Sequence, residues 1–107
     1  MKQHLFTTDE VPGRRIGKAL GLVRGSSVRA RHVGKDIGAF FKNIVGGEMD
    51  EYTKLLAEAR EQALDRLADE AREMGADAVV ALRFCGTEIA AGAAEVLVYG
   101  TAVTLED

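Results

Sequence analysis

The chain contains few of the residues on which disulfide, metal and membrane architectures depend. Its 107 residues include one cysteine, one proline, two histidines and no tryptophan. The single Cys85 excludes an intramolecular disulfide framework and is typical of a reducing compartment. No apolar run approaches the roughly 20 residues that span a bilayer, and the N-terminus has no long apolar segment typical of a secretory signal. We therefore expect a cytoplasmic protein with no membrane partner.

The composition itself is that of an ordinary globular protein, with 47% hydrophobic and 29% charged residues. It predicts a single domain, residues 1–107, with a modest core. Charge is divided unevenly: residues 11–47 hold eight Lys or Arg and one acid, whereas residues 48–107 hold five basic and fourteen acidic residues. Such a division indicates an anionic partner, an ionic contact between subunits, or neutralisation within the fold. We favour the last two explanations over the anionic partner.

The N-terminal part of the sequence has the features of extended structure. Residues 4–11 are rich in β-formers and predict a first strand, and Pro12-Gly13 predicts a turn. From residue 13 to residue 31, glycines recur every four residues, which costs a helix about 1 kcal/mol per glycine. In a strand, this spacing makes one face very small and lets another backbone approach closely. We expect a long, bent strand, or two strands broken near residues 25–27.

Two helices are predicted in the middle of the chain. Residues 36–45 form a short amphipathic pattern, with Asp36 suited to the N-cap and Gly46 to the C-terminal position. The longer helix begins at Met49 or Asp50 and ends before Gly75. Its apolar stripe runs through Tyr52, Leu55, Leu56, Ala59, Ala63, Leu67, Ala71 and Met74. We expect both helices to pack on one face of the sheet.

The C-terminal part predicts two further strands, residues 78–85 and 95–105, joined by a connection over residues 86–94. Both strands are apolar on both faces. One face can pack on the helices, but so short a chain cannot cover the other, which indicates a second subunit. The sequence thus predicts an α+β domain with a mostly antiparallel sheet, in the order strands, helix, helix, strands, whose partner is another copy of itself.

Several segments resemble a known family. They are Ile44-Val45-Gly46-Gly47-Glu48, Tyr52, Gly75-Ala76-Asp77-Ala78-Val79-Val80 and Tyr99-Gly100-Thr101-Ala102-Val103, and they resemble the YbjQ-type family. This family comprises small bacterial and archaeal proteins of uncharacterised function that are often labelled heavy-metal-binding. The similarity covers nearly the whole chain in the same order. It implies a dodecin-like subunit arrangement in a pentameric ring, and it supplies no catalytic or binding residues.

The metal label can be tested against the ligands that the sequence offers. Soft metals bind clusters of thiolates and imidazoles, whereas one subunit has only Cys85, His4 and His32, without metal-ligand spacing. A metal site at Cys85 and His32 would therefore need a subunit interface. A free cysteine, half-buried at a strand end, agrees better with the sequence. A metal ion or a small ligand between subunits is kept as the alternative function.

Four acidic residues follow i, i+4 spacing along the long helix: Glu61, Asp65, Asp69 and Glu73. We call these residues the acidic row. Like charges so placed repel one another and favour a nearby counter-charge. Arg66 and Arg72, a neighbouring subunit's arginines or a hard cation could supply it. A solvated helix face is the simplest interpretation, and an ionic contact between subunits is the next.

Two other functional classes receive less support. An anion or nucleic acid could bind the basic residues Arg14, Arg15, Arg24, Arg29 and Arg31, but no strand interleaves aromatic with basic residues as stacking platforms do. No local Ser/His/acid or Cys/His spacing indicates catalysis, so no enzyme activity is predicted. The leading hypothesis is a cytoplasmic homo-oligomeric ring that acts as a binding or assembly module.

Overall fold

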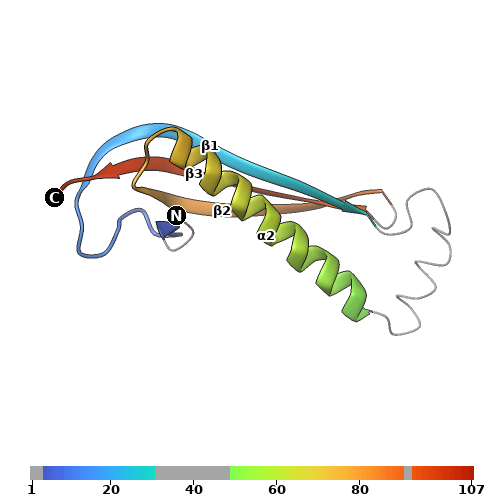
Figure 1. The fold of residues 1–107 in the computed structure, drawn as a ribbon. Coiled ribbons are helices and arrows are strands. Elements are labelled where there is room, and N and C mark those ends of the chain that lie inside the picture. The colour runs from blue at the N-terminus through green and yellow to red at the C-terminus, as the bar shows by residue number, and fades with distance from the viewer. Residues whose placement is uncertain (1–3, 31–48, 91–92) are drawn as a thin grey trace.

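The computed structural model describes residues 4–30, 49–90 and 93–107 and contains one long helix against a sheet (Figure 1). In chain order the elements are β1 (Ile16–Ala30), α2 (Met49–Glu73), β2 (Ala78–Ala90) and β3 (Ala93–Leu105). The predicted α+β class and the long helix are confirmed. The predicted short helix over residues 36–45 lies outside the described residues.

The three strands form one antiparallel sheet in the order β1-β3-β2, with β3 in the centre. The predicted connection over residues 86–94 is wrong, because β2 continues to Ala90 and β3 already begins at Ala93. Pairing between Thr87 and Glu95 and between Glu88 and Ala94 extends the ladder through this stretch. Its alanines have weak intrinsic β-propensity, and cross-strand pairing overrides that preference.

The N-terminal segment, residues 4–15, lies along β2 without becoming a strand, so the predicted strand over residues 4–11 is wrong. Leu5 forms an isolated parallel bridge with Val79. Phe6 donates its N–H to the carbonyl of Val79 at 2.8 Å. Leu82 donates its N–H to the carbonyl of Phe6 at 3.0 Å, and Ala81 donates its N–H to that of Thr8 at 2.8 Å. These bonds do not form a regular ladder, because β2 has a register shift between Val80 and Arg83, where Ala81 adopts a φ of 54°. Such a bulge ends the regular ladder and redirects the neighbouring chain.

The small face of β1 packs directly against the backbone of α2. A Cβ atom added at Gly25 would lie 2.2 Å from the carbonyl oxygen of Ala63 and 2.5 Å from the amide nitrogen of Leu67. The prediction that glycines permit a close backbone approach is therefore confirmed at Gly25. The predicted long strand is confirmed, and the alternative of two strands broken near residues 25–27 is wrong, because β1 runs from Ile16 to Ala30. Its register shifts lie near its start, between Ile16 and Gly21.

Two apolar clusters lie on opposite faces of the sheet. The larger one joins α2 to the sheet and includes Val23, Leu67, Val79 and Val98, all fully buried. The smaller one consists of Val11, Ala78, Val80 and Val103, with Phe6, Ile16 and Leu105 packed against it. The N-terminal segment therefore covers one end of the face that α2 leaves uncovered.

Candidate functional site

The uncovered part of the sheet is the first candidate surface. In β3, the even-numbered residues from Ala94 to Ala102 are buried on the α2 side, and the odd-numbered residues from Glu95 to Thr101 point to the other side. Residues directly opposite each other in an antiparallel pair share a face. By this register, residues from all three strands lie together on the far side. We call them the open sheet face: Leu22, Arg24, Ser26, Val28, Arg83, Cys85, Thr87, Leu97 and Tyr99.

Large apolar side chains on the open sheet face are accessible to solvent. The exposed fractions are 62% for Leu22, 52% for Val28 and 40% for Tyr99. Tyr99 lies between two arginines, since both Arg24 and Arg83 are opposite it in the register. The predicted contrast between a face packed on the helix and a second apolar face without helix cover is therefore present in the structure.

A second exposed aromatic lies on the α2 side of the sheet. Phe84 is opposite Val98, which is buried under α2, and is itself 45% exposed. It lines a small groove of about 220 Å³ together with Leu56, Arg60, Cys85, Gly86 and Val96. We call this groove the Phe84 groove. Exposed apolar surface thus occurs on both faces of the sheet.

The two residues predicted to bind metal have different outcomes. Cys85 is exposed and lies within β2, so the expectation of a half-buried cysteine at a strand end is wrong. Its neighbour across the open sheet face is Leu97. His32 lies outside the described residues. Within residues 4–30, 49–90 and 93–107, no three His, Cys, Asp or Glu side chains are grouped closely enough to hold a metal ion.

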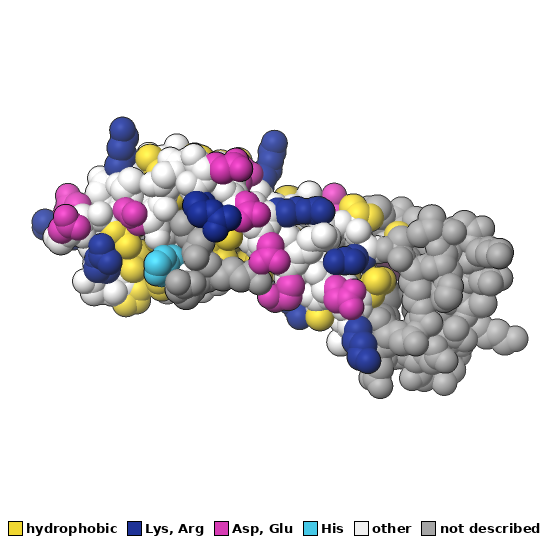
Figure 2. Space-filling view, viewed as in Figure 1, with side chains coloured by type: hydrophobic (Ala, Val, Ile, Leu, Met, Phe, Trp, Pro, Cys, Tyr) yellow, Lys and Arg dark blue, Asp and Glu magenta, His cyan; other side chains and the backbone are white. Residues whose placement is uncertain are grey.

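The acidic row lies on the exposed face of α2, where acidic and basic side chains alternate over the surface (Figure 2). Arg72 donates to the carboxylate of Asp69, which confirms Arg72 as a counter-charge. Arg66 instead donates to the backbone carbonyl of Ser26 at 2.6 Å and so ties α2 to β1.

Basic residues of the first part pair with acidic residues of the second part within the same chain. The Arg29 guanidinium lies 4.0 Å from the carboxylate of Glu58, and that of Arg15 lies 3.7 Å from the carboxylate of Glu106. Exposed pairs of this kind contribute little stability, about 0–1 kcal/mol each. Neutralisation within the fold therefore accounts for part of the uneven charge distribution.

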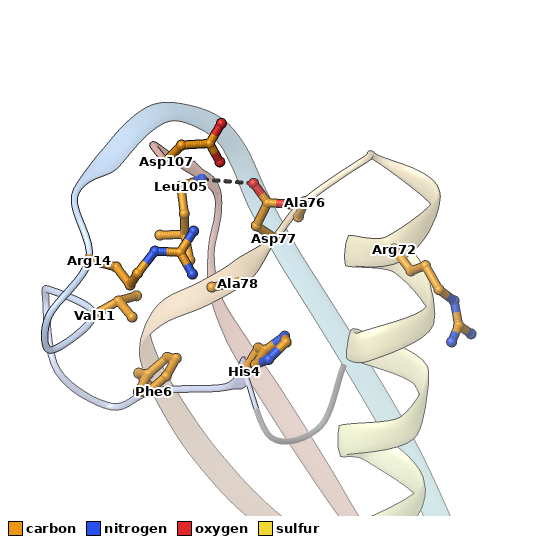
Figure 3. A pocket seen from close by; sticks show the side chains of 10 residues that line it. All are labelled: His4, Phe6, Val11, Arg14, Arg72, Ala76, Asp77, Ala78, Leu105 and Asp107. Atoms are coloured by element: carbon orange, nitrogen blue, oxygen red, sulfur yellow. Dashed lines mark hydrogen bonds between the residues drawn. The ribbon is translucent and has the colours of Figure 1, made fainter.

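A cavity of about 420 Å³ is the second candidate site, and we call it the sheet-end cavity (Figure 3). Three distant stretches line it, within residues 4–14, 72–78 and 105–107. Its wall includes Phe6, Val11 and Leu105, and its polar groups include Arg14 and Asp77. Sequence analysis missed this site because no local motif contains its residues. Phe6 and Val11 belong to the predicted first strand and Leu105 to the predicted last one, and no pattern in the sequence connects them.

The sheet-end cavity is held in place by backbone hydrogen bonds. Asp77 donates its N–H to the carbonyl of Val103 at 2.9 Å, and its Oδ2 accepts the N–H of Leu105 at 2.8 Å (Figure 3). Arg14 donates its N–H to the carbonyl of Val11 at 3.1 Å. The first two bonds connect the start of β2 to the end of β3, and the third closes a turn within the N-terminal segment, which the Phe6–Val79 bond ties to β2. The walls of the cavity are therefore held in place by the fold.

Over the part of the chain that the structure describes, no helix has the length and apolarity required to cross a bilayer. A UPF0145 protein of Clostridioides difficile strain 630 is 55% identical over 103 residues, spanning 96% of this chain and 92% of the relative. A UPF0145 protein of Archaeoglobus fulgidus is 58% identical over 101 residues, spanning 94% of each chain.

The chain is also similar to a protein of known structure and to a family model. The crystal structure is of a protein of unknown function from Pediococcus pentosaceus, assigned to the DUF74 family. It matches with a TM-score of 0.57 at 18% identity, over 95% of this chain and 96% of that one, which supports the fold alone. A family model described as "Putative heavy-metal-binding" matches residues 4–106. The chain therefore belongs to the YbjQ-type family, as the order of its sequence motifs predicts.

Proposed function

We propose that this protein is a homo-oligomeric binding or assembly module, a pentameric ring, in which the open sheet face is a contact between subunits. The observation that carries the proposal is the exposure of Leu22, Val28 and Tyr99 together on that face. Grouped apolar side chains at a surface mark an interaction site, because their transfer out of water is favourable. Arg24 and Arg83, on either side of Tyr99, supply the polar border that such contacts have.

A ring needs two different surfaces on each subunit, because a head-to-tail contact repeats around the axis until it closes. The open sheet face is one such surface. The Phe84 groove, on the α2 side of the sheet, supplies the other. We propose that the open sheet face of one subunit contacts the Phe84 groove of the next subunit. The number five comes from the family resemblance, and the geometry of the contact is our own assignment.

The proposal is tested by size-exclusion chromatography with light scattering at low and physiological salt. We expect a particle of five times the 11.5 kDa subunit mass at both salt concentrations, since apolar contacts are little screened by ions. A stable 11.5 kDa monomer at physiological salt would contradict the proposal.

Metal or small-ligand binding between subunits is the second candidate, and the exposure of Cys85 on the open sheet face favours it. In a ring, that face brings Cys85 against a neighbour, where further ligands can complete a site. Metal analysis after native purification tests this candidate, with Cys85→Ser and His32→Ala as variants. Metal at background level, or a metal content that is unchanged in both variants, would exclude metal binding at these residues.

Anion or nucleic-acid binding through the basic N-terminal part is a third possibility with less support, since Arg15 and Arg29 already pair with Glu106 and Glu58. Contacts to phosphates weaken steeply as salt increases. A binding assay titrated with salt therefore separates it from the first two candidates.

A further inference from the structure

The sheet-end cavity has the size and lining of a small-molecule site. Pockets that bind small molecules usually measure about 300–1,000 Å³ and combine an apolar wall with a few polar groups. Its volume of about 420 Å³ lies at the lower end of this range. The apolar wall is part of a packed cluster, because Val11 is 7% exposed and Ala78 is fully buried, with Phe6 and Leu105 packed against them.

The cationic group of the cavity is the guanidinium of Arg14. Within the described residues, its side chain donates one long hydrogen bond, 3.3 Å to the backbone carbonyl of Glu106. A guanidinium carries five N–H donors in a planar fork that matches a carboxylate. Most of these donors are therefore left for a ligand. Arg72 plays a smaller part, because it donates to Asp69 and its side chain points away from the other lining residues (Figure 3).

The anionic groups of the cavity are the carboxylates of Asp77 and Asp107 (Figure 3). Asp77 is fixed in position because its Oδ2 accepts the N–H of Leu105. Carboxylate oxygens accept more than one hydrogen bond each, so Asp77 can also accept from an ammonium group. The Arg14 guanidinium, with most of its donors unused, and two carboxylates form a site with both signs of charge on an apolar wall, and the imidazole of His4 also lines it.

We propose that the sheet-end cavity binds a small organic zwitterion with an apolar body, such as an α-amino acid. Arg14 binds the carboxylate of the ligand, Asp77 and Asp107 bind its ammonium group, and Phe6 and Leu105 contact the apolar side chain. A simple anion is disfavoured because the two aspartates would repel it. A simple cation is disfavoured by Arg14 in the same way.

This inference does not depend on the proposed ring. The sheet-end cavity lies beside the cluster that the N-terminal segment covers, and none of its lining residues belongs to the open sheet face or to the Phe84 groove. A variant that dissolves the ring by a substitution at Leu22 is therefore expected to bind the same ligand. Failure of one proposal can be distinguished from failure of the other.

The test uses L-phenylalanine as the probe, because Phe6 offers an aromatic wall. Backbone amide signals of the full chain are followed by NMR during titration, with 3-phenylpropionate and 2-phenylethylamine as matched probes that lack the ammonium or the carboxylate. We expect saturable shifts at Phe6, Ala78 and Leu105 with L-phenylalanine. Each matched probe is expected to bind at least about tenfold more weakly, since each loses one charged hydrogen-bonding group.

Variants locate the site. Arg14→Ala is expected to weaken the binding of L-phenylalanine at least about tenfold, and Asp107→Asn is expected to weaken this binding less. Arg15→Ala is the matched control, because Arg15 is the next residue in the chain, is 86% exposed and does not line the cavity. Absence of saturable shifts, equal binding of 3-phenylpropionate, or equal binding to the Arg14→Ala variant would each overturn the proposal.

Discussion

The two faces of the sheet are built from the same three strands but have opposite environments. On the α2 side, Val98 and Val23 are fully buried, whereas on the open sheet face Tyr99 and Leu22, their neighbours in sequence, are exposed. The α2 side is buried because Gly25 and the alanines of the helix let two backbones meet. The comparison indicates that small residues, more than apolar ones, mark the face that packs within the subunit.

The largest expected effect is at the closest contact on the α2 side. Gly25→Ala places a methyl group where only 2.2 Å separates it from the Ala63 carbonyl, so α2 must move away from β1. We expect the free energy of unfolding to fall by about 3 kcal/mol or more, measured by urea denaturation. Gly86→Ala is the matched control, because its added methyl group meets only the Glu95 carbonyl, at 4.0 Å. Equal losses in the two variants would contradict the account.

The next effect compares a leucine of α2 that packs on the covered side of the sheet with a leucine on the open sheet face. Leu67 belongs to α2 and is fully buried in the cluster between the helix and the sheet, so Leu67→Ala should lower the free energy of unfolding by about 2–5 kcal/mol. Leu22 is 62% exposed in the subunit, so Leu22→Ala should change subunit stability by no more than about 0.5 kcal/mol. Both variants are measured at a protein concentration low enough to dissociate the assembly, so that the stability of the subunit is separated from the stability of the assembly. A larger loss for Leu22→Ala than for Leu67→Ala would reverse the assignment of the faces.

The smallest effect concerns the N-terminal segment, which covers one end of the sheet face that α2 leaves uncovered. Arg83 donates to the carbonyl of Thr7 at 2.9 Å and holds this segment against β2. Arg83→Ala should lower the free energy of local opening of this segment by about 1 kcal/mol. The amides of Phe6, Ala81 and Leu82 should therefore exchange their hydrogens faster. Arg24→Ala, at the other register partner of Tyr99, should leave those amides unchanged. Equal acceleration in both variants would show that Arg83 has no special role there.

Much of the fold followed from patterns that are local in sequence. The periodic stripe from residue 52 to residue 74 predicted α2, and the glycine spacing predicted a small face on β1, because each pattern reflects the repeat of its own element. The N-terminal segment was mispredicted because its β-formers meet a bulge at Ala81 that only the paired sheet contains. The extent of β2 and β3 was underestimated because pairing carried alanines and glycines into the ladder.

The candidate sites could be predicted only in part. Apolar residues on both sides of β3 predicted a face in need of a partner, since alternation in a strand is visible in sequence. The combination of Tyr99 with Arg24 and Arg83 depends on register, which the sequence does not state. The sheet-end cavity depends on three stretches far apart in the chain, and no spacing rule connects Arg14 with Asp77. Pairing of distant strands is what brings these groups together.

The central claim is that the open sheet face of one subunit contacts the Phe84 groove of the next. Light scattering of two single variants, Leu22→Glu and Phe84→Glu, tests it most directly, alone and in an equimolar mixture. Each variant should be monomeric alone, and the mixture should form a dimer but no ring, because one intact copy of each surface remains. Glu10→Lys, an exposed charge change on the N-terminal segment, should keep the full assembly. An intact assembly in either variant, or a mixture that stays monomeric, would contradict the account.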